Sequence, residues 1–134
     1  MIAVDTNIIS YRWIASAHSA AADDVWRKDS EWVAPILWRS EFRSVLAGTF
    51  RHKLITLPAA AKIMEQAEAE FSGREFNVSS GAVLRLAGRS ECSAYDCEFV
   101  ALAEQQGVPL ITADRQILRA FPEFALSLDD FLRQ

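Results

Sequence analysis

Apolar residues along this chain occur in two patterns that predict different secondary structure. Short continuous apolar runs, such as Ile2–Val4, are typical of buried strands, whereas an apolar residue at every third or fourth position is typical of a helix. The first run ends at the polar triplet Asp5-Thr6-Asn7, which suits the cap of a helix indicated by Ile8, Ile9, Trp13 and Ile14. The chain therefore begins with a predicted strand, a cap and a helix.

The same two patterns continue to the end of the chain. Further strands are predicted over residues 31–36, 75–78, 108–112 and 124–128. Further helices are predicted over residues 16–27, 37–51, 59–71, 79–88 and 94–106, with a short one through Leu118. Pro58 and Ser93 are suited to helix starts, and Gly73 and Gly107 to helix ends. Strands that alternate with helices predict a three-layer α/β/α sandwich around a mostly parallel sheet.

Length and composition indicate one folded domain over residues 1–134. The sequence is 51% hydrophobic and 24% charged, close to ordinary globular proteins, and it shows no repeat or linker. No apolar run approaches the length of a membrane span, and the N-terminus does not resemble a signal peptide, so we expect a cytoplasmic protein without membrane contact. The net charge of -4 argues against a broad basic surface for nucleic acid but allows local contacts.

Four of the 18 acidic residues occupy positions where an unpaired carboxylate is costly. Asp5 and Asp114 each follow an apolar strand directly, at the sheet edge where ligands of α/β proteins collect. Glu41 and Asp96 fall among apolar positions in the first turns of their predicted helices, and these turns emerge at the same edge. A lone buried carboxylate is destabilising, so we expect a compensating cation. Hard oxygen ligands in this arrangement suit Mg²⁺ or Mn²⁺.

Each acid also has an interpretation that needs no metal. Asp5, Asp96 and Asp114 are placed where helix caps are common. Glu41 could instead pair with Arg39 or Arg43. The convergence of all four acids on one edge favours the metal site over these separate explanations.

Motifs around the four acids resemble those of the PIN-domain family and, within it, the VapC-type toxins of bacterial toxin–antitoxin pairs. The matching pieces span nearly the whole chain in the order and spacing of the family: Val4-Asp5-Thr6-Asn7, Ser40-Glu41-Phe42, Tyr95-Asp96 with Ala101-Leu102-Ala103, and Leu110-Ile111-Thr112-Ala113-Asp114. Each motif alone is common, whereas the ordered set is fairly specific. Residues 53–89 carry no motif.

The resemblance implies a Mg²⁺- or Mn²⁺-dependent endoribonuclease with a parallel five-stranded sheet. It also implies a homodimer, the toxin of a type II pair, that a small antitoxin protein neutralises. By position, Asp5, Glu41, Asp96 and Asp114 resemble the acidic quartet of the family, as both metal ligands and catalytic residues, with Thr6 and Asn7 as supporting polar residues.

Other residues suggest substrate and partner contacts. Arg12, Arg39, Arg43 and Arg115 lie near the motifs and could bind phosphate of an RNA substrate, although pairing with nearby acids is more common; Arg115 is the first choice. The tryptophans at positions 13, 26, 32 and 38 could stack on RNA bases, but packing in the core or an interface is the favoured interpretation. With the apolar helices near the N-terminus they predict a homodimer interface and a groove for an antitoxin helix.

Other classes of site fit the residues less well. Cys92 and Cys97 match no common zinc spacing and lie far from His18 and His52, so we interpret both as buried or reduced thiols. Haloacid-dehalogenase-like phosphatases have a second Asp where this chain has Asn7, and receiver domains have a late lysine, whereas no lysine follows Lys62. The remaining alternative is a PIN-like binding module, catalytically weak, that acts through an antitoxin or an RNA partner.

Overall fold

A parallel sheet of five strands forms the centre of the molecule. The computed structural model describes residues 1–134, and its strands are β1 (Ile2–Val4), β2 (Trp32–Pro35), β3 (Glu75–Phe76), β4 (Leu110–Ile111) and β5 (Ala125–Leu126). Their order across the sheet is β3-β2-β1-β4-β5, and every neighbouring pair is parallel. The strand nearest the N-terminus is therefore the central one, and all of its residues are buried.

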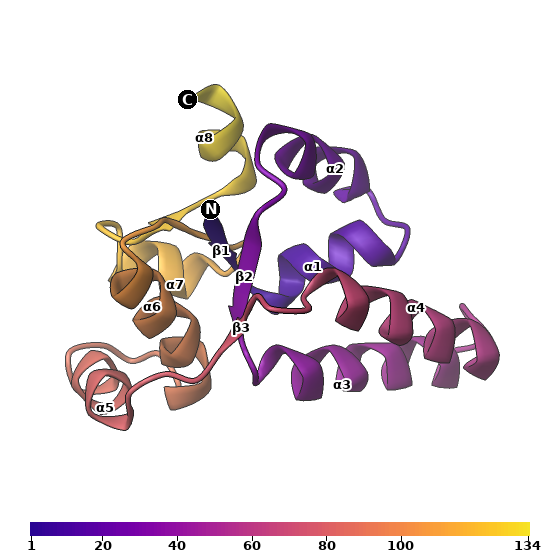
Figure 1. The fold of residues 1–134 in the computed structure, drawn as a ribbon, viewed down its shortest axis with the longest axis horizontal. Coiled ribbons are helices and arrows are strands. Elements are labelled where there is room, and N and C mark those ends of the chain that lie inside the picture. The colour runs from indigo at the N-terminus through magenta and orange to yellow at the C-terminus, as the bar shows by residue number, and fades with distance from the viewer.

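Helices cover both faces of this sheet (Figure 1). They are α1 (Thr6–Trp13), α2 (Ser19–Lys28), α3 (Trp38–Arg51), α4 (Leu57–Glu70), α5 (Ser80–Gly88), α6 (Ala94–Gln106), α7 (Arg115–Ala120) and α8 (Leu128–Arg133). The connections through α1–α2 and α3–α4 move the chain across the sheet in one direction, and those through α5–α6 and α7 move it in the other. Right-handed crossovers therefore place the two sets on opposite faces. The predicted three-layer α/β/α sandwich is confirmed.

The core lies between the sheet and these helices. Helix α6 contacts β1, β2 and β4, and its run Phe99–Ala103 is buried on every side. Trp32 and Trp38 are fully buried, while Trp13 and Trp26 pack partly buried against the core. The interpretation of the tryptophans as packing residues is confirmed. Both cysteines are buried free thiols, as expected.

The structure differs from the predicted elements mainly at the C-terminus. The predicted strand over residues 124–128 is only two residues long, because Ser127 caps an additional helix, α8, that the apolar pattern did not predict. The Ser127 side chain accepts a hydrogen bond from the backbone N–H of Asp130. No helix of the chain combines the length and the apolar character that crossing a bilayer requires.

Candidate active site

Two of the four acids end neighbouring strands of the sheet. Asp5 follows β1 and caps α1, accepting a hydrogen bond of 2.8 Å from the backbone N–H of Thr6. Asp114 follows β4 after two residues and caps α7, accepting from the backbone N–H groups of Gln116 and Ile117. Because β1 and β4 are adjacent and parallel, both carboxyl groups lie at the same sheet edge. Both acids therefore cap helices, as the sequence also allowed, and the capping hydrogen bonds fix the direction of each side chain.

The other two acids lie in the first turns of α3 and α6. In α3 the buried stripe consists of Trp38, Phe42 and Leu46, so Glu41 does not lie within the apolar face that was expected around it, and neither does Val45. They lie beside that stripe, because the helix is rotated relative to the predicted face, and both border a cavity. Asp96 likewise lies beside the buried face of α6, and Ser93 caps the helix through the backbone N–H of Asp96.

All four carboxyl groups line one cavity of about 500 Å³. Its other lining residues are Thr6, Asn7, Ser10, Tyr11, Ser44 and Val45. The predicted convergence of the acids is thus what the fold produces. As the side chains stand, no three acidic, histidine or cysteine groups are close enough together to hold a metal ion. An ion bound here would need small side-chain movements or bridging water molecules, and Mg²⁺ commonly keeps several waters.

Burial gives two of these acids unusual electrostatics. Desolvation raises the pKa of Asp5 from 3.8 to about 6; hydrogen bonds from Thr112 and Thr6 oppose the rise, and the charges of Glu41 and Asp96 add to it. The pKa of Glu41 is also raised, first by burial and then by the charge of Asp96, against the hydrogen bond from Thr6. Burial and the repulsion between neighbouring carboxylates are thus the physical causes that raise both pKa values.

A network of short hydrogen bonds connects the acids. The Thr6 hydroxyl donates to Glu41 Oε1 at 2.6 Å. Asn7 Nδ2 lies 3.4 Å from Asp5 Oδ2, and Asn7 Oδ1 accepts from the backbone N–H of Ala113. Thr6 and Asn7 thus contact the acids that they were expected to support.

Thr112 is a site residue that the sequence analysis did not single out. Its buried hydroxyl donates to Asp5 Oδ2 at 2.7 Å and accepts from the backbone N–H of Asp114 at 3.0 Å. It thereby connects the ends of β1 and β4. The available signal was a hydroxyl at the end of an otherwise apolar strand, directly before Ala113 and Asp114.

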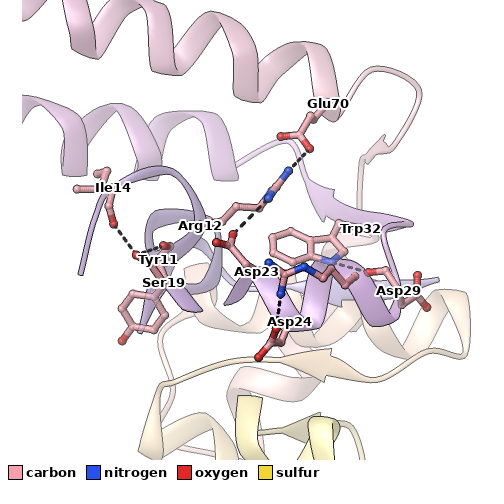
Figure 2. Close-up of polar contacts among 10 residues, drawn as sticks. Tyr11, Arg12, Ile14, Ser19, Asp23, Asp24, Asp29, Trp32 and Glu70 are labelled. Atoms are coloured by element: carbon pink, nitrogen blue, oxygen red, sulfur yellow. Dashed lines mark hydrogen bonds and ion pairs between the residues drawn. The ribbon is translucent and has the colours of Figure 1, made fainter. Parts of the chain in front are cut away.

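The arginines near the motifs divide into paired and unpaired ones. Figure 2 shows Arg12 directed toward Glu70 and Asp23, with N···O distances of 2.9 and 3.5 Å, and its guanidinium lies 4.0 Å from the ring centroid of Trp26. This pairing leaves Arg12 little freedom to bind phosphate.

Arg39 is also engaged in ion pairs, with Glu75 and Glu68. Arg43 and Arg115 are exposed and form no ion pair, and Glu41 pairs with neither Arg39 nor Arg43. Arg115 lines an adjoining cavity that shares Tyr11 with the acidic one.

The fold and the site together define a class: an open parallel α/β sheet with carboxylates gathered at the carboxyl ends of its central strands. A family model described as "PIN domain" matches residues 2–122, so this chain belongs to the PIN domain family. PIN domains are generally nucleases that cleave phosphodiester bonds, and they typically use divalent metal ions. No curated protein shows significant sequence similarity to the chain.

Solved structures share this fold at low sequence identity. The crystal structure of PAE2754 from Pyrobaculum aerophilum is 20% identical, with a TM-score of 0.77 over 98% of this chain and 93% of that one. FitAcB from Neisseria gonorrhoeae is 18% identical, with a TM-score of 0.73 over 96% of this chain and 98% of that one. A structure of FitAB bound to an IR36 DNA fragment is also 18% identical, with a TM-score of 0.69 over 96% of this chain and 95% of that one.

Proposed function

We propose that this chain is a Mg²⁺- or Mn²⁺-dependent endoribonuclease and the toxin of a type II toxin–antitoxin pair. The observation that carries the nuclease proposal is the convergence of Asp5, Glu41, Asp96 and Asp114 on one cavity. Membership of a nuclease family supports the same reaction class. The VapC-like motifs of the sequence support RNA as the substrate.

The residues of the cavity fit a hard divalent cation. Four carboxylates with threonine, serine and asparagine oxygens form a donor set of oxygen atoms, which Mg²⁺ and Mn²⁺ prefer. The anionic form of Asp5 is destabilised by burial, and a cation would relieve that cost. When bound, such an ion supplies a water of lowered pKa and offsets the charge of the phosphate.

The chain's own residues orient this chemistry. Thr112 and Thr6 hold the carboxyl groups of Asp5 and Glu41 in fixed directions through hydrogen bonds of 2.7 and 2.6 Å. Asp96 accepts no hydrogen bond from another side chain, so its carboxylate is free to bind an ion. Arg115 begins the helix that Asp114 caps and, being exposed and unpaired, can contact a substrate phosphate beside the cavity.

No other group in the cavity can activate a water molecule. Neither His18 nor His52 lines it, and both cysteines are buried outside it. The binding-module alternative remains distinct, because a domain that only binds RNA or an antitoxin would not need four acids around one cavity.

We propose a small antitoxin protein as the physiological partner and a homodimer as the assembly. FitAB, one of the similar structures, holds a DNA fragment. By analogy, contact with DNA would belong to the antitoxin, since this acidic chain has no broad basic surface.

Trp32 and Trp38 are buried in the core, so among the tryptophans only the partly buried Trp13 and Trp26 could contribute to a dimer surface. A partner could also cover the exposed large apolar side chains, which are Met1, Ile36, Val45, Leu54, Leu57, Leu84 and Tyr95.

A cleavage assay on total RNA tests the nuclease proposal. The purified chain, freed of inhibitor, should cut RNA with Mg²⁺ or Mn²⁺ and stop on chelation. Asp96→Asn should reduce the rate by orders of magnitude, because an amide binds a hard dication far less well than a carboxylate. Glu104→Gln, in the last turn of the same helix and outside the cavity, is the matched control and should retain activity, since Glu104 forms only a surface ion pair with Arg85.

Three outcomes would count against the proposal of a metal-dependent nuclease. Undiminished activity of Asp96→Asn would show that the cavity is not the catalytic centre. Cleavage that persists in a chelator would refute the metal requirement. A protein that cuts no RNA in any condition, yet binds an antitoxin tightly, would establish the binding-module alternative.

A further inference from the structure

Most lysine and arginine side chains of this chain are already bonded to acids or to backbone carbonyls. Examples are Arg12 with Glu70, and Lys28 with the carbonyl of Phe131. The cations that form no ion pair or hydrogen bond are Arg43, Arg51, Lys53, Lys62, Arg115 and Arg119. Only these can bind a phosphate without breaking an existing contact. Their positions therefore indicate where this acidic chain could bind a polyanion.

The unpaired cations are concentrated in the hairpin formed by α3 and α4. Between Glu41 and Glu65 the sequence contains Arg43, Arg51, Lys53 and Lys62 but no acidic residue, in a chain of net charge -4. Figure 1 shows the two helices running side by side away from the sheet, with the turn that joins them at the far end. Arg51, His52 and Lys53 are consecutive and exposed in this turn, which we call the basic tip.

One face of α3 connects the acidic cavity to the basic tip. Glu41, Val45, Gly48 and His52 are spaced by three or four residues, so they lie in a row along the helix. Val45 lines the cavity and is exposed, and a Cβ added at Gly48 would meet no atom within 4 Å. The small residues Val45 and Gly48 therefore leave an open surface between Glu41 and His52, which are about 16 Å apart along the helix at 1.5 Å per residue.

We propose that the basic tip binds backbone phosphates of the RNA substrate, with the strand lying along this face of α3 and the scissile bond at the acidic cavity. The inference rests on the proposed nuclease function and adds a second contact with the RNA, distant from the cavity. A cluster of carboxylates repels phosphates, so the enzyme needs cations outside the cavity that hold the strand in place. Arg115 on α7 is unpaired and lines the adjoining cavity, and the basic tip is the distant anchor.

The test compares two double variants with the same change in net charge. Arg51→Gln with Lys53→Gln removes the charges of the basic tip. Arg27→Gln with Arg133→Gln is the matched control, since both arginines are exposed and pair only within their own helices. Each pair is made in the Asp96→Asn background, so that RNA is bound without being cut. Circular dichroism establishes that both variants are folded.

The readout is the salt dependence of binding to a fluorescently labelled single-stranded RNA. Each lost phosphate contact should lower the slope of log affinity against log salt by about 0.7, so the tip variant should lose about 1.4 and the control nothing. In the otherwise unaltered enzyme, the same tip substitutions should raise KM and leave kcat nearly unchanged, because contacts remote from the reacting bond stabilise substrate and transition state alike.

The outcomes separate this inference from the proposed function. Active enzyme with equal salt slopes for the tip and control variants would overturn the inference alone. A protein that never cuts RNA but shows the tip-dependent slope would overturn the nuclease function and leave the basic tip as an RNA-binding site. If the exposed Leu54 and Leu57 instead make the hairpin a protein-binding surface, RNA affinity will not respond to the tip substitutions, which also refutes the inference.

Discussion

Replacing Asp5 with asparagine should stabilise the metal-free protein at neutral pH while abolishing its proposed activity. The Asp5 side chain is buried at the end of the central strand, and burial raises its pKa from 3.8 to about 6. The folded state therefore binds a proton more tightly at this group than the unfolded state does. An amide of nearly the same shape removes the buried charge and keeps the acceptor for the Thr6 N–H.

The size of the effect follows from the two pKa values. Their difference corresponds to about 3 kcal/mol, the cost of holding Asp5 ionised in the fold. The folded pKa is the higher one, so stability falls as pH rises from about 4 to 6, and the full cost applies above pH 6. The side-chain NH₂ group of asparagine faces hydrogen-bond donors that the Asp5 carboxylate accepts from. We subtract about 1 kcal/mol from the stability gain for this unfavourable contact. The net gain expected at pH 7.5 is about 2 kcal/mol.

Urea denaturation in the presence of a chelator, at several pH values, measures this gain. The advantage of Asp5→Asn over the unaltered chain should be largest above pH 6. Below about pH 4, where the Asp5 carboxyl group is protonated in both the folded and unfolded states, the variant should be the less stable protein by about 1 kcal/mol. Mg²⁺ should then raise the stability of the unaltered chain only, by about 2.7 kcal/mol at a hundred times its Kd. The order of the two stabilities would thereby reverse when the ion binds.

Glu65→Gln is a suitable control because Glu65 is exposed on α4 and forms no ion pair or hydrogen bond. It should change stability little at any pH. A variant at Asp5 that is less stable than the unaltered chain at pH 7.5, or whose advantage does not depend on pH, would refute the argument from desolvation. Equal stabilisation of both proteins by Mg²⁺ would show that Asp5 is not a ligand.

Three other expected outcomes test separate parts of the structure. Thr112→Val should destabilise the fold by about 2 kcal/mol in urea and slow cleavage, because Asp5 loses a hydrogen bond and the Asp114 N–H loses its acceptor; unchanged stability and rate would contradict this role. Arg39→Met should destabilise the fold most at neutral pH, since Arg39 lowers the pKa of Glu75 and this stabilisation disappears as that carboxylate is protonated in acid; a loss that is constant from pH 7 to 3 would argue against it. Light scattering at micromolar concentration should give the mass of a dimer, and a monomer would remove the homodimer proposal but not the nuclease.

The sequence predicted best those elements whose ends are marked by local capping residues. Helix α6 begins after Ser93 and ends at Gly107, as predicted, because a side-chain cap and a residue with positive φ determine both ends locally. Strands β3, β4 and β5 are shorter than predicted, since hydrogen-bonded neighbours determine a strand's length. Helix α8 was missed because its signal is the cap at Ser127 rather than a long apolar repeat.

For the candidate site, sequence identified the acids but not their surroundings. The parallel fold brings strand ends and helix starts to one edge, so the position of each acid in its element was enough to predict convergence. The hydrogen bond from Thr112 to Asp5 joins residues 107 positions apart, and no local pattern encodes it. The pairing of Arg12 with Glu70 is also non-local, so the sequence could indicate that Arg12 pairs with an acid but not which one.

The central position of β1 also determines when the site can exist during synthesis. Asp5 is made before β4 and Thr112, which complete its surroundings and follow more than a hundred residues later. In a growing chain that lacks β4, the side of β1 that pairs with β4 has no partner strand, and Asp114 cannot lie beside Asp5. A chain that stops before β4 therefore lacks the assembled site, and the proposed activity can begin only once β4 has left the ribosome.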